Sequence, residues 1–569
     1  MFPAQTSLIP ATVALVRFIE ANGFGNNYPY WYLGTTPVKY LIGPVVPGLL
    51  IGIHKILPQF SLFDLSYGII LTSYFLFALG WGLLSYKLFG NKNIGYLVGF
   101  LSLFLPWHTI SALAFGEVSA VLGGALTPWV LLGFSVQGLV TRGEKKLISK
   151  LYTLIPIFLF ALLLLTNTTA SIPAIIGLVI LGMISDKHWE QGIKKAAVVI
   201  VLGWVLTLWW YAPNYWVTIF GAPSIGGKSA FGAFIALLNS LRSLLPVVLA
   251  IILVYWKVKP KTIYEKFTLS WLVVFGSMTL LRFMADPDFW MDWTSWMGEV
   301  EVGLALVMAT MVDRSVHHFK KRSTEINLDS DSLNSVSLRP SLANNFNLNS
   351  KLHFSARSVM FLKWLTSRRS SIFLTLFSIY LIVGWFFAFQ NRSFWLPKAS
   401  IEGTVEYKIA KWLGEEIRTG PVSSFPPTSA RSRGNSNLDV ESFGELRAVG
   451  SPSTAATRSD DVPTVFLSGS TAFWLNSLVD VAQVRGGRDE ASVDDMWRQA
   501  VWEIREGKDV EASLGWLWRL NVKYLVVHTE NSGEFYHDFK YPEKFEGIRS
   551  LVKVYDEGGD RVYLVKNDN

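Results

Sequence analysis

Long runs of apolar residues without charges constrain this chain more than any other feature of its sequence. A helix needs about 20 mostly apolar residues to cross a bilayer. About ten candidates occur, at residues 65–87, 94–106, 118–139, 149–166, 171–185, 196–212, 235–256, 266–284, 297–312 and 371–390. The chain is 51% hydrophobic and only 17% charged, which is unusual for a soluble protein. We therefore expect a mainly α-helical, polytopic transmembrane bundle in the cell membrane.

The charges between these segments predict their orientation. Residues 391–569 hold 22 Lys and Arg against 27 Asp and Glu, so the net charge of +8 comes from the apolar part of the chain. Lysine and arginine gather in alternate connections, at residues 87–92, 142–150, 187–195, 257–266 and 313–370. Basic connections stay in the cytoplasm, so these are predicted to be cytoplasmic and the aromatic connections between them to lie outside. Nucleic acid is excluded as a partner, because the basic surplus serves to orient the spans.

The region before the first span is predicted to lie outside. Residues 1–64 are expected to form an outer loop with an amphipathic surface helix at 7–23, followed by the transmembrane bundle at 65–312. An N-terminus outside the membrane, without a signal peptide, has no obvious route across. We therefore expect that this chain lacks a natural first helix; the alternative is translocation of a short N-terminal tail.

The region after the bundle is predicted to contain a linker, one more span and a small domain. Residues 323–358 are rich in Ser, Asn and Leu, so residues 313–370 are expected to be a flexible cytoplasmic linker, with the last transmembrane helix at 371–390. Residues 391–569 alternate strand-like runs (TVFLSG, KYLVVHT, LVKVYDE, RVYLVK) with helical ones. This pattern predicts a small extracytoplasmic α/β domain, with a disordered insert at 420–463.

Ionisable residues at the outer ends of spans are the first candidates for a site, because placing them against lipid is costly unless they are used or paired. His108 and Glu117 flank a predicted turn. They could be a general base with an orienting partner, two metal ligands, or simply solvated residues at headgroup level. The sequence has no cysteine, so a thiolate metal site and a cysteine nucleophile are excluded.

An acidic, aromatic segment before residue 303 supplies further candidates. Asp288 and Asp292 are spaced as i and i+4 on a helix and could share a divalent cation that bridges a phosphate. Glu299 and Glu301 are two residues apart and cannot share one helix face, so one of them is predicted to point into the bundle. The metal requirement itself stays open at this point.

Three basic residues are candidates for phosphate binding. Arg242 and Arg282 are the arginines inside or at the end of predicted spans, and Lys228 lies in a Gly-rich outer connection. Arginine suits bidentate recognition of phosphate, and a lipid-linked phosphate would be presented at this depth. The alternative is an arginine that pairs with a nearby carboxylate or reaches outward to the headgroups.

Several motifs together resemble a known group of proteins. YPYWYLGTTPVKYLIGPVVP, FGEVSAVLGGALTPW and GSTAFWLNSLVDVAQVRGGRDE are similar to segments of prokaryotic membrane proteins labelled pyruvoyl-tetrahydropterin-synthase-related. Their layout resembles GT-C glycosyltransferases. The resemblance implies transfer of a sugar from a polyprenyl-phosphate donor to a glycan or protein acceptor on the outer face. The alternative function is a non-catalytic membrane scaffold or envelope-assembly protein.

The sequence departs from the GT-C pattern at one place. GT-C enzymes typically carry an acidic residue in the first outer loop, whereas this chain has no Asp or Glu before Glu20. The resemblance then implies one of two things. Either another carboxylate takes the place of this acidic residue, with Glu117, Asp288 and Asp292 as the candidates, or the chain is inactive.

Overall fold

A computed structural model places most of the chain. It describes residues 2–140, 146–185, 188–221, 245–285, 296–312, 368–392, 396–419, 464–494 and 496–566. The predicted insert at 420–463 lies outside the described residues, as does the predicted linker up to residue 367.

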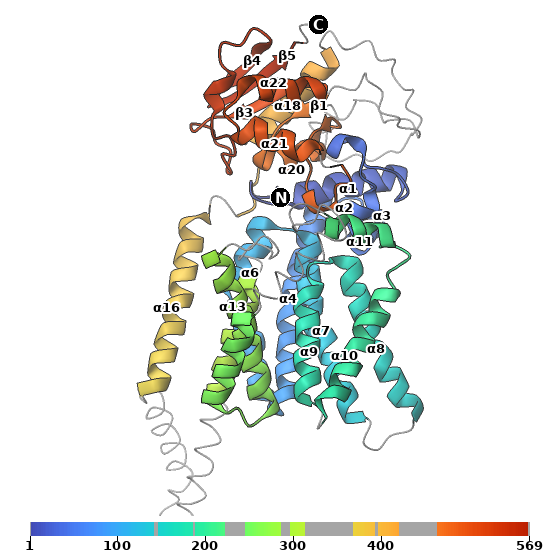
Figure 1. The fold of residues 1–569 in the computed structure, drawn as a ribbon, viewed down its shortest axis with the longest axis vertical. Helices are drawn as coiled ribbons and strands as arrows, with labels where there is room; N and C mark the ends of the chain where they lie inside the picture. Colours follow the sequence, from blue (N-terminus) through green and yellow to red (C-terminus); the bar gives the residue numbers. More distant parts are fainter. Residues whose placement is uncertain are drawn as a thin grey trace, which may run out of the picture.

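A bundle of helices makes up the larger part of the described structure (Figure 1). Its helices are α4 (Leu62–Phe89), α5 (Lys92–Ser102), α6 (Pro106–Ile110), α7 (Val118–Val140), α8 (Lys146–Thr166), α9 (Ser171–Ser185), α10 (Trp189–Val205), α13 (Ile263–Ala285) and α16 (Arg368–Gln390), with further helices over 245–258 and 296–312. The ends of α4 follow from its sequence. The Ser61 hydroxyl accepts a hydrogen bond from the Asp64 backbone N–H, and Gly90 ends the helix with a φ of 67°.

Fewer spans are evident than the sequence predicts. Among the described residues, two helices are long and apolar enough to cross a membrane, namely α4 and residues 118–136 of α7. The pair formed by α5 and residues 106–115 is bent by 49° and adds a third if it counts as one span. Shorter apolar helices are present as well, so a membrane location is supported. The predicted number of about ten membrane spans is not confirmed.

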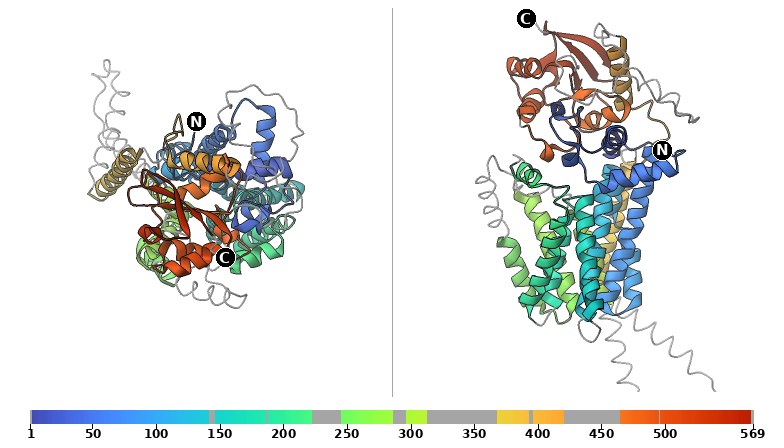
Figure 2. Two further views of the ribbon diagram at one scale, coloured as in Figure 1. Left: turned by 90° about the horizontal axis from the view of Figure 1, so that it is seen from above. Right: turned by 90° about the vertical axis from the view of Figure 1, so that its right-hand side faces the viewer.

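The C-terminal domain covers one end of the bundle, which we call the domain-side end (Figures 1 and 2). Its five-stranded sheet has the order β2-β1-β3-β5-β4, with β1 parallel to β2 and β3, and β5 antiparallel to β3 and β4. The strands are β1 (Thr464–Phe466), β2 (Ala482–Gln483), β3 (Val522–His528), β4 (Leu551–Glu557) and β5 (Asp560–Val565). The helices are α18 (Val405–Thr419), α20 (Gly469–Leu478), α21 (Met496–Glu506) and α22 (Val510–Arg519). The prediction of a small α/β domain is confirmed.

Helix α1 (Ile9–Asn22) is not at the surface, so the prediction of an amphipathic surface helix is wrong in this respect. Ten of its residues are buried, because it packs against both α4 and α20. The charged residues that suggested a polar face are engaged instead. Arg17 donates a hydrogen bond to the Ser477 carbonyl (2.6 Å), and Glu20 lies 3.6 Å from His54.

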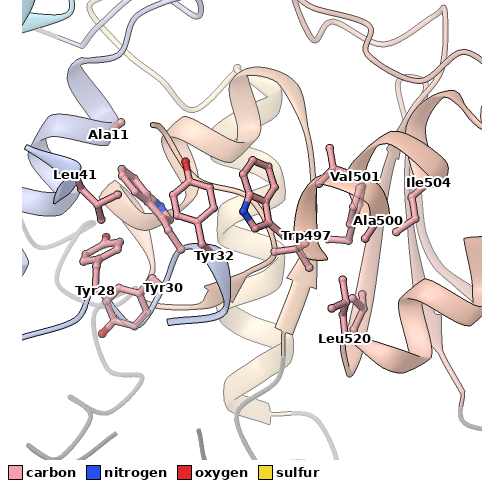
Figure 3. Close-up of a cluster of buried hydrophobic side chains, with 14 of the residues drawn as sticks. Ala11, Tyr28, Tyr30, Tyr32, Leu41, Trp497, Ala500, Val501, Ile504 and Leu520 are labelled. Atoms are coloured by element: carbon pink, nitrogen blue, oxygen red, sulfur yellow. The ribbon is translucent and has the colours of Figure 1, made fainter. Parts of the chain in front are cut away.

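The first loop and the C-terminal domain share one hydrophobic core (Figure 3). The loop contains a 3-10 turn (Tyr32–Gly34), α2 (Val38–Leu41) and α3 (Val45–Ile56). The centroid of the Tyr32 ring lies 4.8 Å from that of Trp497 of α21, with the two rings tilted by 47°. The Trp31 indole N–H donates to the Asn476 side chain (2.9 Å). The segment between Ala11 and Ile42 therefore shares a core with the C-terminal domain.

Candidate functional site

The connection between α8 and α9 lies at the domain-side end of the bundle (Figure 1). Its sequence, TNTTAS at 166–171, is polar between two apolar helices. Asn167 orders this connection, because its Oδ1 accepts hydrogen bonds from the backbone N–H groups of Thr169 (2.9 Å) and Ala170 (3.0 Å). Capping of this kind fixes the start of the following helix and the direction of the side chains before it.

Glu117 is held against this connection. The side-chain amide of Asn167 donates to Glu117 Oε1 (3.1 Å), and the Ser119 hydroxyl donates to the same oxygen (3.0 Å). Gly116 has a φ of 52°, which ends the preceding turn and allows α7 to begin at Val118. The partly exposed Glu117 thus stands at the N-terminal end of α7, where the helix dipole favours a negative charge.

Arg488 reaches the same connection from the C-terminal domain. Its Nη2 donates to Thr168 Oγ1 (2.9 Å) and to the hydroxyl of Tyr215 (3.3 Å) on α11 (Pro213–Gly221). Its backbone N–H donates to the Tyr32 hydroxyl (2.7 Å) in the first loop. Three other segments that are distant in sequence thus meet at this one residue, two at its side chain and one at its backbone.

The two charged residues are joined through consecutive residues of one connection. Asn167 binds Glu117, and Thr168 binds Arg488. A carboxylate can accept a proton, and a guanidinium can bind an oxyanion such as a phosphate through two parallel hydrogen bonds. The arrangement therefore suits proton transfer beside an anionic group at the end of the membrane helices.

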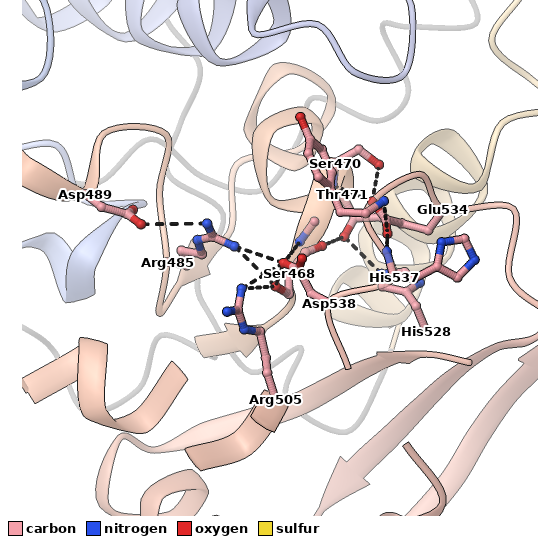
Figure 4. Close-up of polar contacts among 12 residues, drawn as sticks. Ser468, Ser470, Thr471, Arg485, Asp489, Arg505, His528, Glu534, His537 and Asp538 are labelled. Atoms are coloured by element: carbon pink, nitrogen blue, oxygen red, sulfur yellow. Dashed lines mark hydrogen bonds and ion pairs between the residues drawn. The ribbon is translucent and has the colours of Figure 1, made fainter. Parts of the chain in front are cut away.

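A polar network supports the RGGRDE loop, residues 485–490, which carries Arg488 (Figure 4). Asp538 Oδ2 accepts hydrogen bonds from Arg485 (3.2 Å), Arg505 (2.8 Å) and the Ser468 hydroxyl (2.5 Å). Burial opposes ionisation of Asp538, but the Ser468 hydrogen bond and the two arginine charges outweigh it. The pKa of Asp538 therefore lies below its ordinary value.

The structure gives His108 and Glu117 different partners and does not bring them together. The His108 ring stacks between Tyr74 (5.0 Å between centroids) and Phe77 (3.9 Å) on α4. Glu117 instead faces the 166–171 connection. The geometry favours a packing role for His108.

Glu301 points into the bundle, as predicted for one of the two neighbouring glutamates. Its two carboxylate oxygens accept hydrogen bonds from the backbone N–H groups of Trp107 (2.8 Å) and His108 (3.0 Å), the first available after Pro106. The Tyr380 hydroxyl of α16 also donates to it. Because lipid offers no water to these N–H groups, Glu301 serves as the cap of α6.

Of the other predicted site residues, Arg282 alone belongs to the described part of the chain. Asp288, Asp292, Lys228 and Arg242 lie outside the described residues, and Arg282 lies near the C-terminal end of α13. Within the part of the chain that the structure describes, no group of three or more His, Asp and Glu residues could hold a metal ion.

Comparison with solved structures identifies the fold. No protein-family model and no curated protein sequence match this chain. The oligosaccharyltransferase AglB from Archaeoglobus fulgidus, in complex with an inhibitory peptide and a dolichol-phosphate, aligns over 100% of this chain and 71% of its own, with a TM-score of 0.53 and 12% identity. The same enzyme with a tethered acceptor peptide covers 100% and 70%, with a TM-score of 0.50 and 15% identity. ArnT from Cupriavidus metallidurans in the apo state covers 99% and 93% at 13% identity, with a TM-score of 0.44.

The AglB likeness shows that this chain has the overall fold of a GT-C glycosyltransferase. At this identity it shows the fold alone, so the site must be argued from the residues of this chain.

Apart from Glu117, the residues of the site were not predicted from the sequence, above all Thr168 and Arg488. Their signals exist but are weak: a run of small polar residues between two apolar helices, and an arginine after two glycines. Neither signal shows that the two segments meet, because they are 320 residues apart.

Proposed function

We propose that this chain is an integral membrane glycosyltransferase that moves a sugar from a polyprenyl-phosphate donor to an acceptor. One observation carries the proposal. Glu117 and Arg488 form hydrogen bonds with two consecutive residues, Asn167 and Thr168, in the connection between α8 and α9 at the domain-side end of the bundle. The GT-C fold supports it, since AglB was captured with a dolichol-phosphate and a peptide. A lipid-linked sugar and a glycan or protein acceptor are the proposed partners.

The proposed reaction is a single displacement. An acceptor hydroxyl attacks the anomeric carbon of the sugar, and the bond from that carbon to the phosphate oxygen breaks. The bonding electrons leave with the lipid phosphate, and the hydroxyl proton passes to the Glu117 carboxylate, which acts as a general base. In-line displacement of this kind inverts the anomeric carbon.

The domain-side end is proposed to lie outside the cytoplasm. The connections between α4 and α5 and between α9 and α10 lie at the end of the bundle away from the C-terminal domain (Figure 1). Lys87, Lys92, Lys194 and Lys195 lie in or beside these connections. Because basic connections stay in the cytoplasm, the C-terminal domain and the site would face outward.

A divalent cation is part of the same proposal. Asp288 and Asp292 are the pair that would hold it next to a phosphate. Treatment with EDTA is then expected to abolish transfer, and added Mg²⁺ or Mn²⁺ to restore it. Transfer that continues unchanged in EDTA would remove the cation from the proposal.

A transfer assay tests the proposed function. Purified full-length protein in lipid nanodiscs is incubated with radiolabelled polyprenyl-phosphate sugars, and release of sugar from the lipid is measured. Glu117→Gln keeps an oxygen for Asn167 but removes the base, so the rate is expected to fall by about 100-fold or more.

The matched control is Glu402→Gln, which changes an exposed glutamate of the C-terminal domain and should leave the rate unchanged. A transfer rate in Glu117→Gln equal to that of the wild type would contradict the assignment of Glu117 as the base. Absence of transfer from any polyprenyl-phosphate sugar would favour the non-catalytic scaffold.

A further inference from the structure

The two arginines of the RGGRDE loop point in different directions. Arg485 and Asp489 lie 3.7 Å apart, and Arg485 also reaches Asp538 inside the C-terminal domain (Figure 4). The Tyr32 hydroxyl donates to Asp489 Oδ1 (3.0 Å), so this carboxylate is engaged with the first loop as well as with Arg485. Arg488 contacts the bundle instead. A positive group is thereby directed to the bundle while its acidic neighbour is turned elsewhere.

Two glycines bring the loop backbone close to the first loop. A Cβ atom on Gly486 would lie 2.7 Å from Cβ and Cγ of Trp31, and one on Gly487 would lie 3.0 Å from the same indole. A residue with a side chain could not approach so closely without displacing Trp31. This close approach places Arg488 at the domain-side end of the bundle, where it contacts Thr168.

A buried tyrosine hydroxyl lies within electrostatic range of the Arg488 guanidinium. Tyr211 is 0% exposed, and its hydroxyl has no hydrogen-bond partner among the residues that the structure describes. Its ring lies 4.4 Å from that of Tyr215, and the Arg488 charge interacts electrostatically with it. Gly43 passes so close that a Cβ there would lie 3.0 Å from the hydroxyl. Leaving a buried donor without an acceptor is costly. The unpaired hydroxyl therefore suits an acceptor oxygen that a bound ligand would supply.

We infer that Arg488 and the hydroxyls of Tyr211 and Tyr215 bind a phosphate group at the domain-side end of the bundle. The Thr168 hydroxyl, 2.9 Å from Arg488, supplies a further donor. These groups can all donate hydrogen bonds, and the guanidinium is permanently charged, which matches the oxygens of a phosphate ester. The lipid origin of that phosphate rests on the proposed function, whereas the phosphate site itself does not. The site is incomplete without the C-terminal domain, which contributes Arg488.

Binding to the full-length protein in phosphatidylcholine nanodiscs tests the inference with three probes. These are a polyprenyl phosphate, the corresponding polyprenol, and inorganic phosphate. The polyprenyl phosphate is expected to bind at least tenfold more tightly than the polyprenol. Inorganic phosphate that binds equally well, and depends on Arg488, would support the site with a free phosphate as its ligand.

Variants locate the site. Arg488→Gln and Tyr211→Phe are each expected to weaken polyprenyl phosphate binding by about tenfold, because each removes a donor. Tyr211→Phe keeps the ring and its packing, so its effect does not depend on loss of folding. Arg519→Gln, an exposed arginine of α22 that packs on Trp516, is the control and should bind as the wild type does.

The inference is overturned if no phosphate probe binds, or if Arg488→Gln and Tyr211→Phe bind like the wild type. Its failure is distinguishable from that of the proposed function. Sugar transfer that is insensitive to Arg488→Gln would reject the phosphate site and keep the enzyme. Phosphate binding that depends on Arg488, without any sugar transfer, would keep the site and reject the enzyme.

Discussion

At the scale of single residues, Asp538 shows how the polar network holds the RGGRDE loop. Its carboxylate faces Arg485 and Arg505, whose side chains are each 17% exposed. Breaking a largely buried pair on one side is costly, because the remaining charges keep their desolvation without compensation. Asp538 therefore matters for stability and for the position of the loop.

Asp538→Asn is expected to destabilise the C-terminal domain by about 3 kcal/mol at neutral pH. Thermal unfolding of the full-length protein, followed by tryptophan fluorescence, measures this. Asp556→Asn is the control, since that aspartate is 46% exposed and pairs with Lys553 at the surface, where such pairs contribute about 0–1 kcal/mol.

The same carboxylate predicts a pH dependence. The folded pKa of Asp538 is depressed, so its contribution is present above the unfolded pKa of about 3.9 and is lost as the pH falls through the folded value. The difference in stability between wild type and Asp538→Asn should therefore shrink below about pH 4. A difference that stays constant down to pH 2 would contradict the ionised pair.

At the scale of elements, α16 depends on a few polar contacts to dock on the bundle. Many of its apolar side chains are exposed, including Leu376, Ile382 and Phe386. At its docking face, Gly384 lies against Pro106, and the Tyr380 hydroxyl donates to Glu301, the cap of α6. One carboxylate thus connects α6, α16 and the helix over 296–312.

Tyr380→Phe is expected to loosen the docking of α16, because it removes a hydrogen bond between helices where lipid supplies no replacement. Since the chain has no cysteine, spin labels on cysteines introduced at Ile382 of α16 and Tyr96 of α5 report the distance between these two helices without background. The distance distribution should broaden in Tyr380→Phe but not in Tyr86→Phe, a matched change at an exposed tyrosine of α4. Equal distributions in all three proteins would show that packing alone docks α16.

At the scale of the whole molecule, the first loop joins the bundle to the C-terminal domain. Tyr32 and Arg488, which are 456 residues apart in sequence, are bonded directly. The same core contains residues of α1, the first loop and α21 (Figure 3). The candidate site exists because this packing brings the RGGRDE loop to the end of the bundle.

Gly486→Ala tests this packing. The added methyl group would lie 2.7 Å from Trp31, so it should displace the loop and make the junction more sensitive to limited proteolysis. Gly515→Ala is the control, because nothing lies within 4 Å of the added atom there, and alanine favours the helix by about 1 kcal/mol. Equal sensitivity of the two variants would show that Gly486 does not set the approach.

The sequence predicts what is local and misses what is distant. The strands of the C-terminal domain follow from alternating apolar residues, and Glu117 follows from its place at the end of an apolar run. The burial of α1 could not be predicted, because its second partner, α20, comes more than 400 residues later. Arg488 was missed for the same reason: an arginine in a polar loop carries no sign of the bundle that it contacts.

A structure of the full-length protein in a nanodisc with a polyprenyl phosphate bound would test the proposed site most directly. We predict that the phosphate lies within hydrogen-bonding distance of Arg488 and the Tyr211 hydroxyl, on the same side of the membrane as Glu117 and the C-terminal domain. A phosphate bound at the opposite end of the bundle, or one that does not contact Arg488, would contradict it.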